Sequence, residues 1–232
     1  MSGAQVMLLA AGRGERMRPL TDTCPKPLLQ VRGRPLLEWH LRALEQAGYA
    51  QAVINTAWLG EQVERHCGEV VGGVRLRYSH EGRDFGGALE TAGGIARALP
   101  LLDEVFWVAA GDVYVPGFGF ERERLRDFAA GGRGAHLFLV PNPEHNPRGD
   151  FGLGPDGSAT NGGEPRFTYS TIGLYRRSFF DELPSGNPAG LKVALAPMLR
   201  RAMDNGLVSA ELYDGPWTDV GTPERLARLN AP

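Results

Sequence analysis

A short segment near the start of the sequence combines glycines with basic residues. Gly12 and Gly14 flank Arg13, Arg16 follows two positions later, and Lys26 lies ten residues further on, between two prolines. Glycines let backbone N–H groups approach an anion, and arginine and lysine supply positive charge for phosphate oxygens. We therefore predict that this segment binds a polyphosphate.

The segment differs from two well-known phosphate-binding loops. The dinucleotide fingerprint G-x-G-x-x-G requires a third glycine, and Met17 occupies that position. The Walker loop G-x-x-x-x-G-K-[S/T] is absent. An ordinary glycine turn with solvated arginines is the alternative, but the grouping of Arg16, Arg18 and Lys26 favours a phosphate site.

Two aspartates are candidate metal ligands. Asp112 follows an apolar run through Gly111, which we expect to let a ligand approach the backbone, and α/β folds bind ligands at the carboxyl ends of central strands. Asp219 lies in the segment W-T-D-V-G-T. Two carboxylates that share a cation with nucleotide phosphates are typical of Mg²⁺, the predicted cofactor. Each aspartate could instead belong to a turn or a helix N-cap, and Thr222 does resemble a helix start.

Two further segments are rich in groups that suit a nucleoside and a sugar. Residues 81–94 contain several glycines, which cost helix stability and indicate a backbone close to a flat base or ribose; a flexible surface loop is the alternative. Residues 142–151 contain a histidine, asparagines, an arginine and Asp150. We expect Asp150 to accept hydrogen bonds from sugar hydroxyls.

The elements that must position these residues alternate between strands and helices. Strands are predicted at 6–11, 52–55, 74–79, 105–110 and 137–140, and helices at 35–47, 59–67, 90–99 and 121–130. This alternation implies an α/β fold with a mostly parallel central sheet, covered on both faces. The later part of the chain is predicted to contain loops and short hairpin strands at 141–166, a strand at 167–175, a helix at 191–203, a strand at 208–213 and a last helix that ends near residue 229.

The bulk properties exclude several function classes. The net charge of −2 provides no basic field for nucleic acid, and two cysteines cannot form a disulfide framework. No signal peptide and no long apolar run are present, so we expect a cytoplasmic protein without a membrane partner. We predict a single domain, 1–232, with a nucleotide-binding part at about 1–140 and a sugar-binding part at about 141–232. We expect a monomer or a weak homo-oligomer.

The run L-A-A-G-R-G-E-R-M-R-P-L-T-D-T-C-P-K-P-L-L resembles the signature of the sugar-1-phosphate nucleotidyltransferases. Gly111-Asp112 and the segment 217–222 match two further landmarks of that family, in order, so the similarity spans nearly the whole chain. The resemblance implies a three-layer α/β/α Rossmann-like fold. It also implies an enzyme that transfers a nucleotidyl group to a sugar 1-phosphate and releases pyrophosphate.

Within that family, the short length and the segments L-L-E-W-H-L and A-L-E-T-A-G-G-I resemble the members that use UTP and N-acetylmuramate α-1-phosphate in peptidoglycan recycling. Mannose-1-phosphate guanylyltransferases and other hexose-1-phosphate nucleotidyltransferases are the alternative. Two residues depart from the expected pattern, because Ala92 stands where a glycine is expected and Ala110 where an amide is common. The second departure concerns one contact with the sugar.

The resemblance also implies residue roles. Arg16 would stabilise the leaving pyrophosphate, Lys26 would lie between the two reacting phosphates, and Asp112 and Asp219 would hold Mg²⁺. The residues expected at the nucleotide are Ala10, Ala11, Gly12, Gly14, Glu15, Arg16, Lys26, Glu81, Gly87 and Thr91, of which Glu81, Gly87 and Thr91 would surround the uracil. The residues expected at the sugar are Ala110, Asp150, Glu164 and Thr171.

Two other function classes fit the sequence less well. A metal-dependent glycosyltransferase would be expected to carry a D-x-D motif, but Val113 and Tyr114 follow Asp112. A non-catalytic nucleotide-binding regulator would be expected to lack Arg16, Lys26 or one aspartate, and all of these are present.

Overall fold

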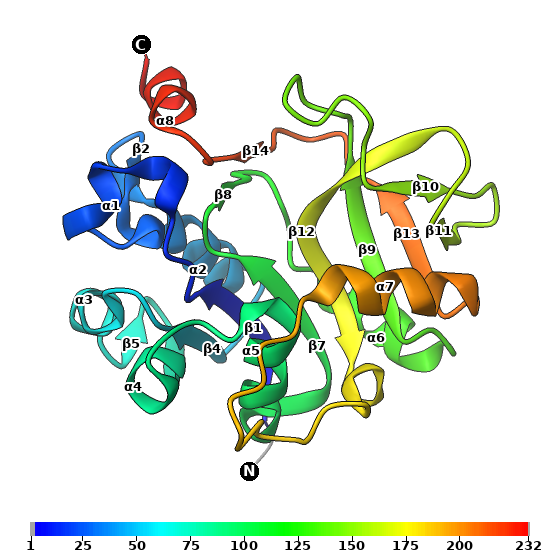
Figure 1. Cartoon of the computed structure of the whole chain (residues 1–232), viewed down its shortest axis with the longest axis horizontal. Coiled ribbons are helices and arrows are strands. Elements are labelled where there is room, and N and C mark those ends of the chain that lie inside the picture. Colours follow the sequence, from blue (N-terminus) through cyan, green and yellow to red (C-terminus); the bar gives the residue numbers. More distant parts are fainter. Residues whose placement is uncertain (1–2, 232) are drawn as a thin grey trace.

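A mixed β-sheet forms the centre of the molecule (Figure 1), and the computed structural model describes residues 3–231. Its strands follow the order β11-β10-β12-β7-β1-β4-β6-β5, and β9 pairs with both β12 and β13. Strands β1, β4, β6 and β7 are mutually parallel, whereas β12 runs antiparallel to β7 and β9. The ten strands are β1 (Ala4–Ala10), β4 (Gln51–Thr56), β5 (Val70–Val71), β6 (Val74–His80), β7 (Leu102–Ala110), β9 (Ala135–Val140), β10 (Phe151–Leu153), β11 (Ala159–Thr160), β12 (Arg166–Arg176) and β13 (Val208–Leu212).

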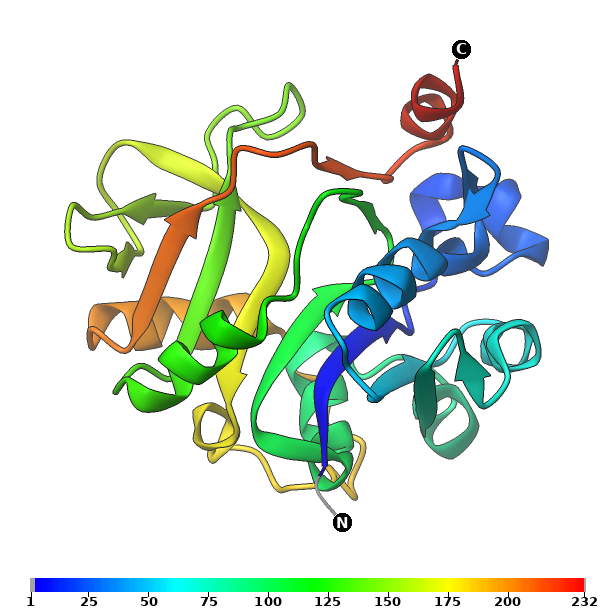
Figure 2. The same ribbon diagram turned by 180° about the vertical axis from the view of Figure 1, so that it is seen from behind.

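Helices cover both faces of this sheet, which gives three layers. Helices α5 (Glu90–Ala98) and α7 (Leu195–Asp204) lie on the face nearer the viewer in Figure 1, and α2 (Leu36–Gln46) and α6 (Arg122–Ala130) lie on the opposite face, seen in Figure 2. The remaining helices are α1 (Leu20–Thr23), α3 (Gly60–Cys67), α4 (Glu81–Phe85) and α8 (Pro223–Asn230). The predicted three-layer α/β/α class is confirmed.

Each face of the sheet has its own hydrophobic core. Leu37, Leu41 and Leu44 of α2 pack on one face together with residues of α3 and α6, while α5 and α7 contribute apolar side chains to the other. Apolar residues at helical spacing therefore point toward the sheet, as the periodicity predicts. Burial of each such side chain contributes about 1.5–3 kcal/mol, so these two cores hold the strand ends in fixed positions.

The predicted helix at 191–203 begins later than expected, at Leu195. The backbone of Val193 accepts hydrogen bonds from the N–H groups of Ala92 and Gly93 and donates one to Leu89. Because this extended segment pairs with the start of α5, it cannot take part in helix α7. Sequence periodicity contains no information on such a distant backbone partner.

Two pairs of short strands lie outside the central sheet. Strand β2 (Gln30–Val31) pairs with β3 (Arg34–Pro35), and β8 (Val113–Tyr114) pairs with β14 (Thr218–Asp219). The sheet contains strands from both predicted parts of the chain, and the predicted division near residue 140 stays a prediction. Within residues 3–231, no helix combines the length and apolar character needed to cross a membrane.

Candidate active site

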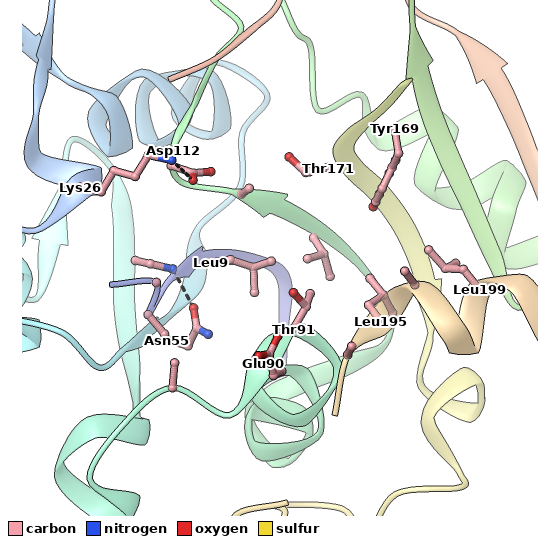
Figure 3. A pocket seen from close by; sticks show the side chains of 18 of the residues that line it. Leu9, Lys26, Asn55, Glu90, Thr91, Asp112, Tyr169, Thr171, Leu195 and Leu199 are labelled. Carbon is pink, nitrogen blue, oxygen red and sulfur yellow. Dashed lines mark hydrogen bonds and ion pairs between the residues drawn. The ribbon is translucent and has the colours of Figure 1, made fainter. Parts of the chain in front are cut away.

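A cavity of about 730 Å³ opens at the carboxyl ends of β1, β4 and β7 (Figure 3). This is the edge of a parallel sheet at which α/β folds bind ligands. Ten of the predicted site residues line it: Ala10, Ala11, Gly12, Lys26, Glu81, Thr91, Ala110, Asp112, Asp150 and Thr171. Six do not line it: Gly14, Glu15, Arg16, Gly87, Glu164 and Asp219.

An ion pair joins two of the predicted catalytic residues across the mouth of the cavity. Lys26 Nζ lies 2.5 Å from Asp112 Oδ2, and the Lys26 residue is only 8% exposed. Lys26 comes from the 3-10 helix Lys26–Leu28, and Asp112 follows β7. The Asp112 carboxylate holds the largely buried Lys26 amine at the cavity wall. The amine is thus placed to contact an anionic ligand.

The glycine loop folds around the stem of Lys26. Gly14 has φ +65°, and a Cβ added there would lie 3.2 Å from Lys26 Cβ, so a larger residue would be strained and would crowd the lysine. Thr21 Oγ1 donates to the Gly14 carbonyl at 2.8 Å and closes the loop. Gly14 therefore leaves space for the Lys26 stem, and its predicted contact with the nucleotide stays a prediction.

The two arginines of the loop have different surroundings. Arg13 lines the cavity, its guanidinium lies 3.7 Å from the centroid of the Trp58 ring, and Nη2 pairs with Asp22 at 3.0 Å. Arg16 is exposed, and its side chain forms no ion pair with any residue in 3–231. The predicted contact of Arg16 with pyrophosphate stays a prediction, and Arg13 is an additional basic residue at this site.

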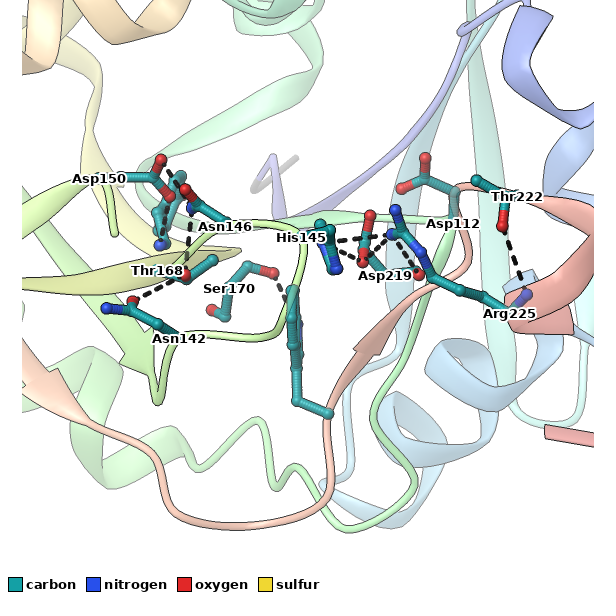
Figure 4. Close-up of polar contacts among 12 residues, drawn as sticks. Asp112, Asn142, His145, Asn146, Asp150, Thr168, Ser170, Asp219, Thr222 and Arg225 are labelled. Atoms are coloured by element: carbon teal, nitrogen blue, oxygen red, sulfur yellow. Dashed lines mark hydrogen bonds and ion pairs between the residues drawn. The ribbon is translucent and has the colours of Figure 1, made fainter. Parts of the chain in front are cut away.

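Asp219 reaches the same region from the far end of the chain. Strand β14 pairs with β8 so that Asp219 lies opposite Val113, the residue that follows Asp112 in the chain. The Val220 N–H donates to the Asp112 carbonyl at 3.2 Å. Figure 4 shows Asp112 and Asp219 in one region of the molecule, with the Arg225 head group between them. Arg225 donates to Asp219 Oδ1, which also lies 2.9 Å from His145 Nε2. Thr222, not Asp219, caps helix α8, which removes the N-cap alternative for this aspartate.

The donor set at this point fits a small divalent cation. The two aspartates lie on neighbouring backbone segments. Lys26 occupies only Oδ2 of Asp112, and Arg225 and His145 occupy only Oδ1 of Asp219. Residues 3–231 contain no cluster of three or more His, Cys, Asp or Glu side chains that could hold a metal by themselves. A site of this kind suits Mg²⁺, which takes one or two protein carboxylates and completes its shell with phosphate and water.

Buried groups hold the segment around Asp112 in place. His40 Nε2 lies 3.0 Å from the Val113 carbonyl, and burial lowers the pKa of His40 to about 4, so the ring is neutral near pH 7.

Gly111 is closely packed against a neighbouring strand. A Cβ there would lie 2.9 Å from the Leu9 carbonyl, so the neighbouring strand by itself favours a glycine here, and the predicted approach of a ligand stays a prediction.

A buried network connects the end of β1 with the start of α5. Asn55 Oδ1 accepts from the Ala10 N–H at 2.8 Å, Asn55 Nδ2 donates to Glu81 Oε1 at 2.6 Å, and the Leu89 N–H donates to Glu81 Oε2 at 2.7 Å. Glu81 is 0% exposed, and burial raises the pKa of its carboxyl group. Both oxygens are bonded to protein donors, so we assign Glu81 to positioning; its predicted contact with uracil stays a prediction.

The glycines of residues 81–94 mostly accommodate protein atoms. A Cβ on Gly93 would lie 2.3 Å from the Leu191 carbonyl, and one on Gly94 would lie 2.5 Å from Glu81 Oε1. The interpretation of these two glycines as a surface for a flat base was therefore wrong. By contrast, a Cβ on Gly86 or Gly87 would meet nothing within 4 Å.

Two non-glycine residues with left-handed backbone line the cavity. Glu90 has φ +62° and Thr171 has φ +65°. Thr171 lies where the register of β12 shifts, between Tyr169 and Gly173. Backbone strain of this kind costs about 1–3 kcal/mol and clusters at functional sites. Thr171 was predicted at the sugar, whereas Glu90 is an additional residue of the cavity wall that was not among the predicted site residues.

The sugar side of the cavity contains Asp150. Its Oδ1 accepts from Asn146 Nδ2 at 3.1 Å and its Oδ2 from the Tyr169 N–H at 2.8 Å, which fixes the carboxylate at the wall. Each oxygen has further acceptor capacity for a hydroxyl. Glu164 is exposed and outside the wall, and its predicted contact with the sugar stays a prediction.

The Glu81 network makes a testable prediction for stability. We expect Glu81→Gln to lower the free energy of unfolding by about 1–3 kcal/mol, because two buried donors then share one acceptor oxygen. Urea denaturation measures this change. Glu61→Gln, on an exposed position of α3, is the matched control and should stay within about 0.5 kcal/mol of the wild type. Unchanged stability of Glu81→Gln together with lost turnover would instead assign Glu81 to the ligand.

Comparison with known proteins agrees with this geometry. Residues 5–158 match the sequence model of the family described as Nucleotidyl transferase. A protein from Neisseria meningitidis serogroup B named N-acetylmuramate α-1-phosphate uridylyltransferase is 48% identical over 232 residues, covering 98% of this chain and 97% of that protein. A protein of the same name from Caulobacter vibrioides is 31% identical, covering 94% and 92%.

The fold also has solved neighbours. The structure of a putative glucose-1-phosphate thymidylyltransferase from Bacillus anthracis matches with a TM-score of 0.78 at 22% identity, covering 97% of this chain and 93% of that one. HddC from Yersinia pseudotuberculosis, solved with GMP-PN, matches with a TM-score of 0.72 at 16% identity, covering 97% of each chain. The matched family and the two relatives of full length assign the chain to the nucleotidyl transferase family, as a sugar-1-phosphate nucleotidyltransferase.

Proposed function

We propose that this enzyme transfers a uridylyl group from UTP to N-acetylmuramate α-1-phosphate, giving UDP-N-acetylmuramate and pyrophosphate. The observation that carries the reaction type is the Lys26–Asp112 ion pair, which lies beside Asp219 at the carboxyl edge of the sheet. The two similar proteins of that name support the choice of base and sugar. Peptidoglycan recycling in the cytoplasm is the proposed setting.

The reaction is an in-line displacement that needs positioning and charge neutralisation. An oxygen of the sugar phosphate attacks the α-phosphorus of UTP, and the bond from that phosphorus to the β-phosphate bridging oxygen breaks. Lys26 would hold both reacting phosphates and reduce the repulsion between them. The backbone of residues 10–14, together with Arg13 and Arg16, would neutralise the departing pyrophosphate.

We propose that Asp112 and Asp219 hold Mg²⁺ during this reaction. The ion supplies charge neutralisation for the reacting phosphates when it is bound. Arg225 and His145 keep the Asp219 carboxylate in place, and the pairing of β8 with β14 keeps it beside Asp112. For the nucleoside we propose Gly87 and Thr91, with Glu81 behind them; for the sugar we propose Ala110, Asp150, Glu164 and Thr171.

A panel of substrates tests the proposed function. UTP, GTP, ATP and dTTP are each mixed with the 1-phosphates of N-acetylmuramate, N-acetylglucosamine, glucose and mannose in the presence of Mg²⁺, and pyrophosphate release is measured. We expect the largest kcat/KM for UTP with N-acetylmuramate 1-phosphate. Preference for GTP with mannose 1-phosphate would make the enzyme a guanylyltransferase. Binding of UTP without pyrophosphate release from any pair would indicate a regulator.

A further inference from the structure

Helix α7 and strand β10 form the wall of the cavity that faces away from Lys26 and Asp112. Leu195 and Leu199 of α7 lie there beside Tyr169 (Figure 3). Arg200 comes next on α7 and also lines the cavity. A basic residue at the end of the cavity that is remote from the reacting phosphates needs an explanation other than phosphate binding.

Two contacts hold the guanidinium group of Arg200. Its Cζ lies 5.2 Å from the centroid of the Phe151 ring, and Nη1 donates to Asn161 Oδ1 at 2.6 Å. Stacking on an aromatic face leaves the edge of a guanidinium available for hydrogen bonds. The side chain is therefore ordered before a ligand arrives.

Within the part of the chain that the structure describes, Arg200 lacks the acidic partner that each of the other two basic residues of the cavity wall has. Lys26 pairs with Asp112, and Arg13 pairs with Asp22. Across residues 3–231, no aspartate or glutamate forms an ion pair with Arg200. A guanidinium has five N–H donors, so one bond to Asn161 leaves most of them free. This end of the cavity therefore favours a ligand with a negative charge.

We propose that Arg200 binds a carboxylate on the acceptor sugar, and this inference rests on the proposed function. N-acetylmuramate differs from N-acetylglucosamine by a lactyl ether that carries a carboxylate and a methyl group. Arginine matches a carboxylate with two parallel N–H···O bonds, and Leu195 and Leu199 provide apolar surface for the methyl group. Arg200 is then the residue that distinguishes the acidic sugar from neutral ones.

This assignment explains how the enzyme would prefer the acidic sugar phosphate to a neutral one. A neutral sugar phosphate fits the phosphate end equally well but leaves Arg200 without an anionic partner in a partly enclosed site. Sites built around a specific polar contact reject ligands that lack it, because the group in the site stays unsatisfied. The preference therefore needs no clash with the neutral sugar.

Steady-state kinetics with Arg200→Met tests the inference, because methionine keeps an unbranched stem and removes the charge. KM and kcat are measured for N-acetylmuramate 1-phosphate and N-acetylglucosamine 1-phosphate at saturating UTP. We expect the preference of the enzyme for the acidic sugar, as a ratio of kcat/KM values, to fall by about tenfold to a hundredfold, mainly through KM. Arg200→Lys, which keeps the charge without the planar fork, should fall between this variant and the wild type.

The matched control is Arg201→Met. Arg201 is the next residue on α7, lies on the surface and pairs with Glu182 at 2.7 Å, so its loss should leave the ratio unchanged. An unchanged ratio in Arg200→Met, with the wild type still preferring the acidic sugar, would overturn the inference alone. A wild type that prefers a neutral sugar phosphate would overturn the proposed function itself. Should Arg200→Met fail to fold, the ratio in Arg200→Lys decides: a fall supports the inference and an unchanged ratio contradicts it.

Discussion

Asp112→Asn should lower kcat by about 10²–10³-fold, which corresponds to about 2.7–4 kcal/mol of lost transition-state stabilisation. The substitution keeps the shape of the side chain but removes the charge that pairs with Lys26 at 2.5 Å and the anionic oxygen offered to a cation. Initial rates of pyrophosphate release over a range of Mg²⁺ concentrations measure the effect. We expect the Mg²⁺ concentration that gives half-maximal rate to rise as well.

Asp204→Asn is the control for this experiment, because Asp204 is an exposed carboxylate at the end of α7. It should retain the wild-type rate and the wild-type Mg²⁺ dependence. Thermal unfolding of both variants separates lost chemistry from lost folding. Wild-type turnover in Asp112→Asn at ordinary Mg²⁺ would remove Asp112 from the metal site.

Lys26→Met should reduce kcat/KM for both substrates by at least about 10²-fold. The amine is largely buried, and its removal leaves Asp112 beside the cavity without its positive partner, so the two reacting phosphates meet an uncompensated negative charge. Arginine should not restore activity, since Lys26 is only 8% exposed and its amine already contacts Asp112, which leaves little room for the larger guanidinium. Initial-rate kinetics with each substrate varied in turn measure the change.

The sequence offers a matched control for Lys26. The chain contains two lysines, and the second, Lys192, is exposed on the segment before α7. Lys192→Met should retain wild-type kcat/KM. Equal kinetics of Lys26→Met and the wild type would exclude Lys26 from the mechanism and would leave Arg13 and Arg16 as the cationic groups at the phosphates.

Local chemistry singled out the glycine loop, Lys26 and Asp112 as candidates, and the structure places Gly12, Lys26 and Asp112 in the wall of one cavity. Glycine, lysine and aspartate have properties that do not depend on the rest of the fold, and a strand followed by a loop places them at one edge of a parallel sheet. The same reasoning predicted the long helices and strands, because hydrophobic periodicity reports which face of an element is buried. Their alternation indicated an α/β fold with a sheet covered on both faces, and the family resemblance implied the three-layer α/β/α class.

The sequence did not reveal why several of these residues are required. Gly93, Gly94 and Gly111 look like ligand-facing glycines, yet their neighbours are Leu191, Glu81 and Leu9. Such contacts join segments that are distant in the chain or lie on adjacent strands. They depend on sheet register and loop path, which a one-dimensional pattern does not encode.

The chemistry of the site was thus determined by the sequence, and its assembly was decided by tertiary structure. Asp219 lies near Asp112 only because β14 pairs with β8, more than a hundred positions earlier in the chain. Arg200 faces the same cavity only because α7 packs beside the sheet. Residue type and local spacing set what each group can do, whereas the packing of helices on both faces of the sheet sets which groups meet.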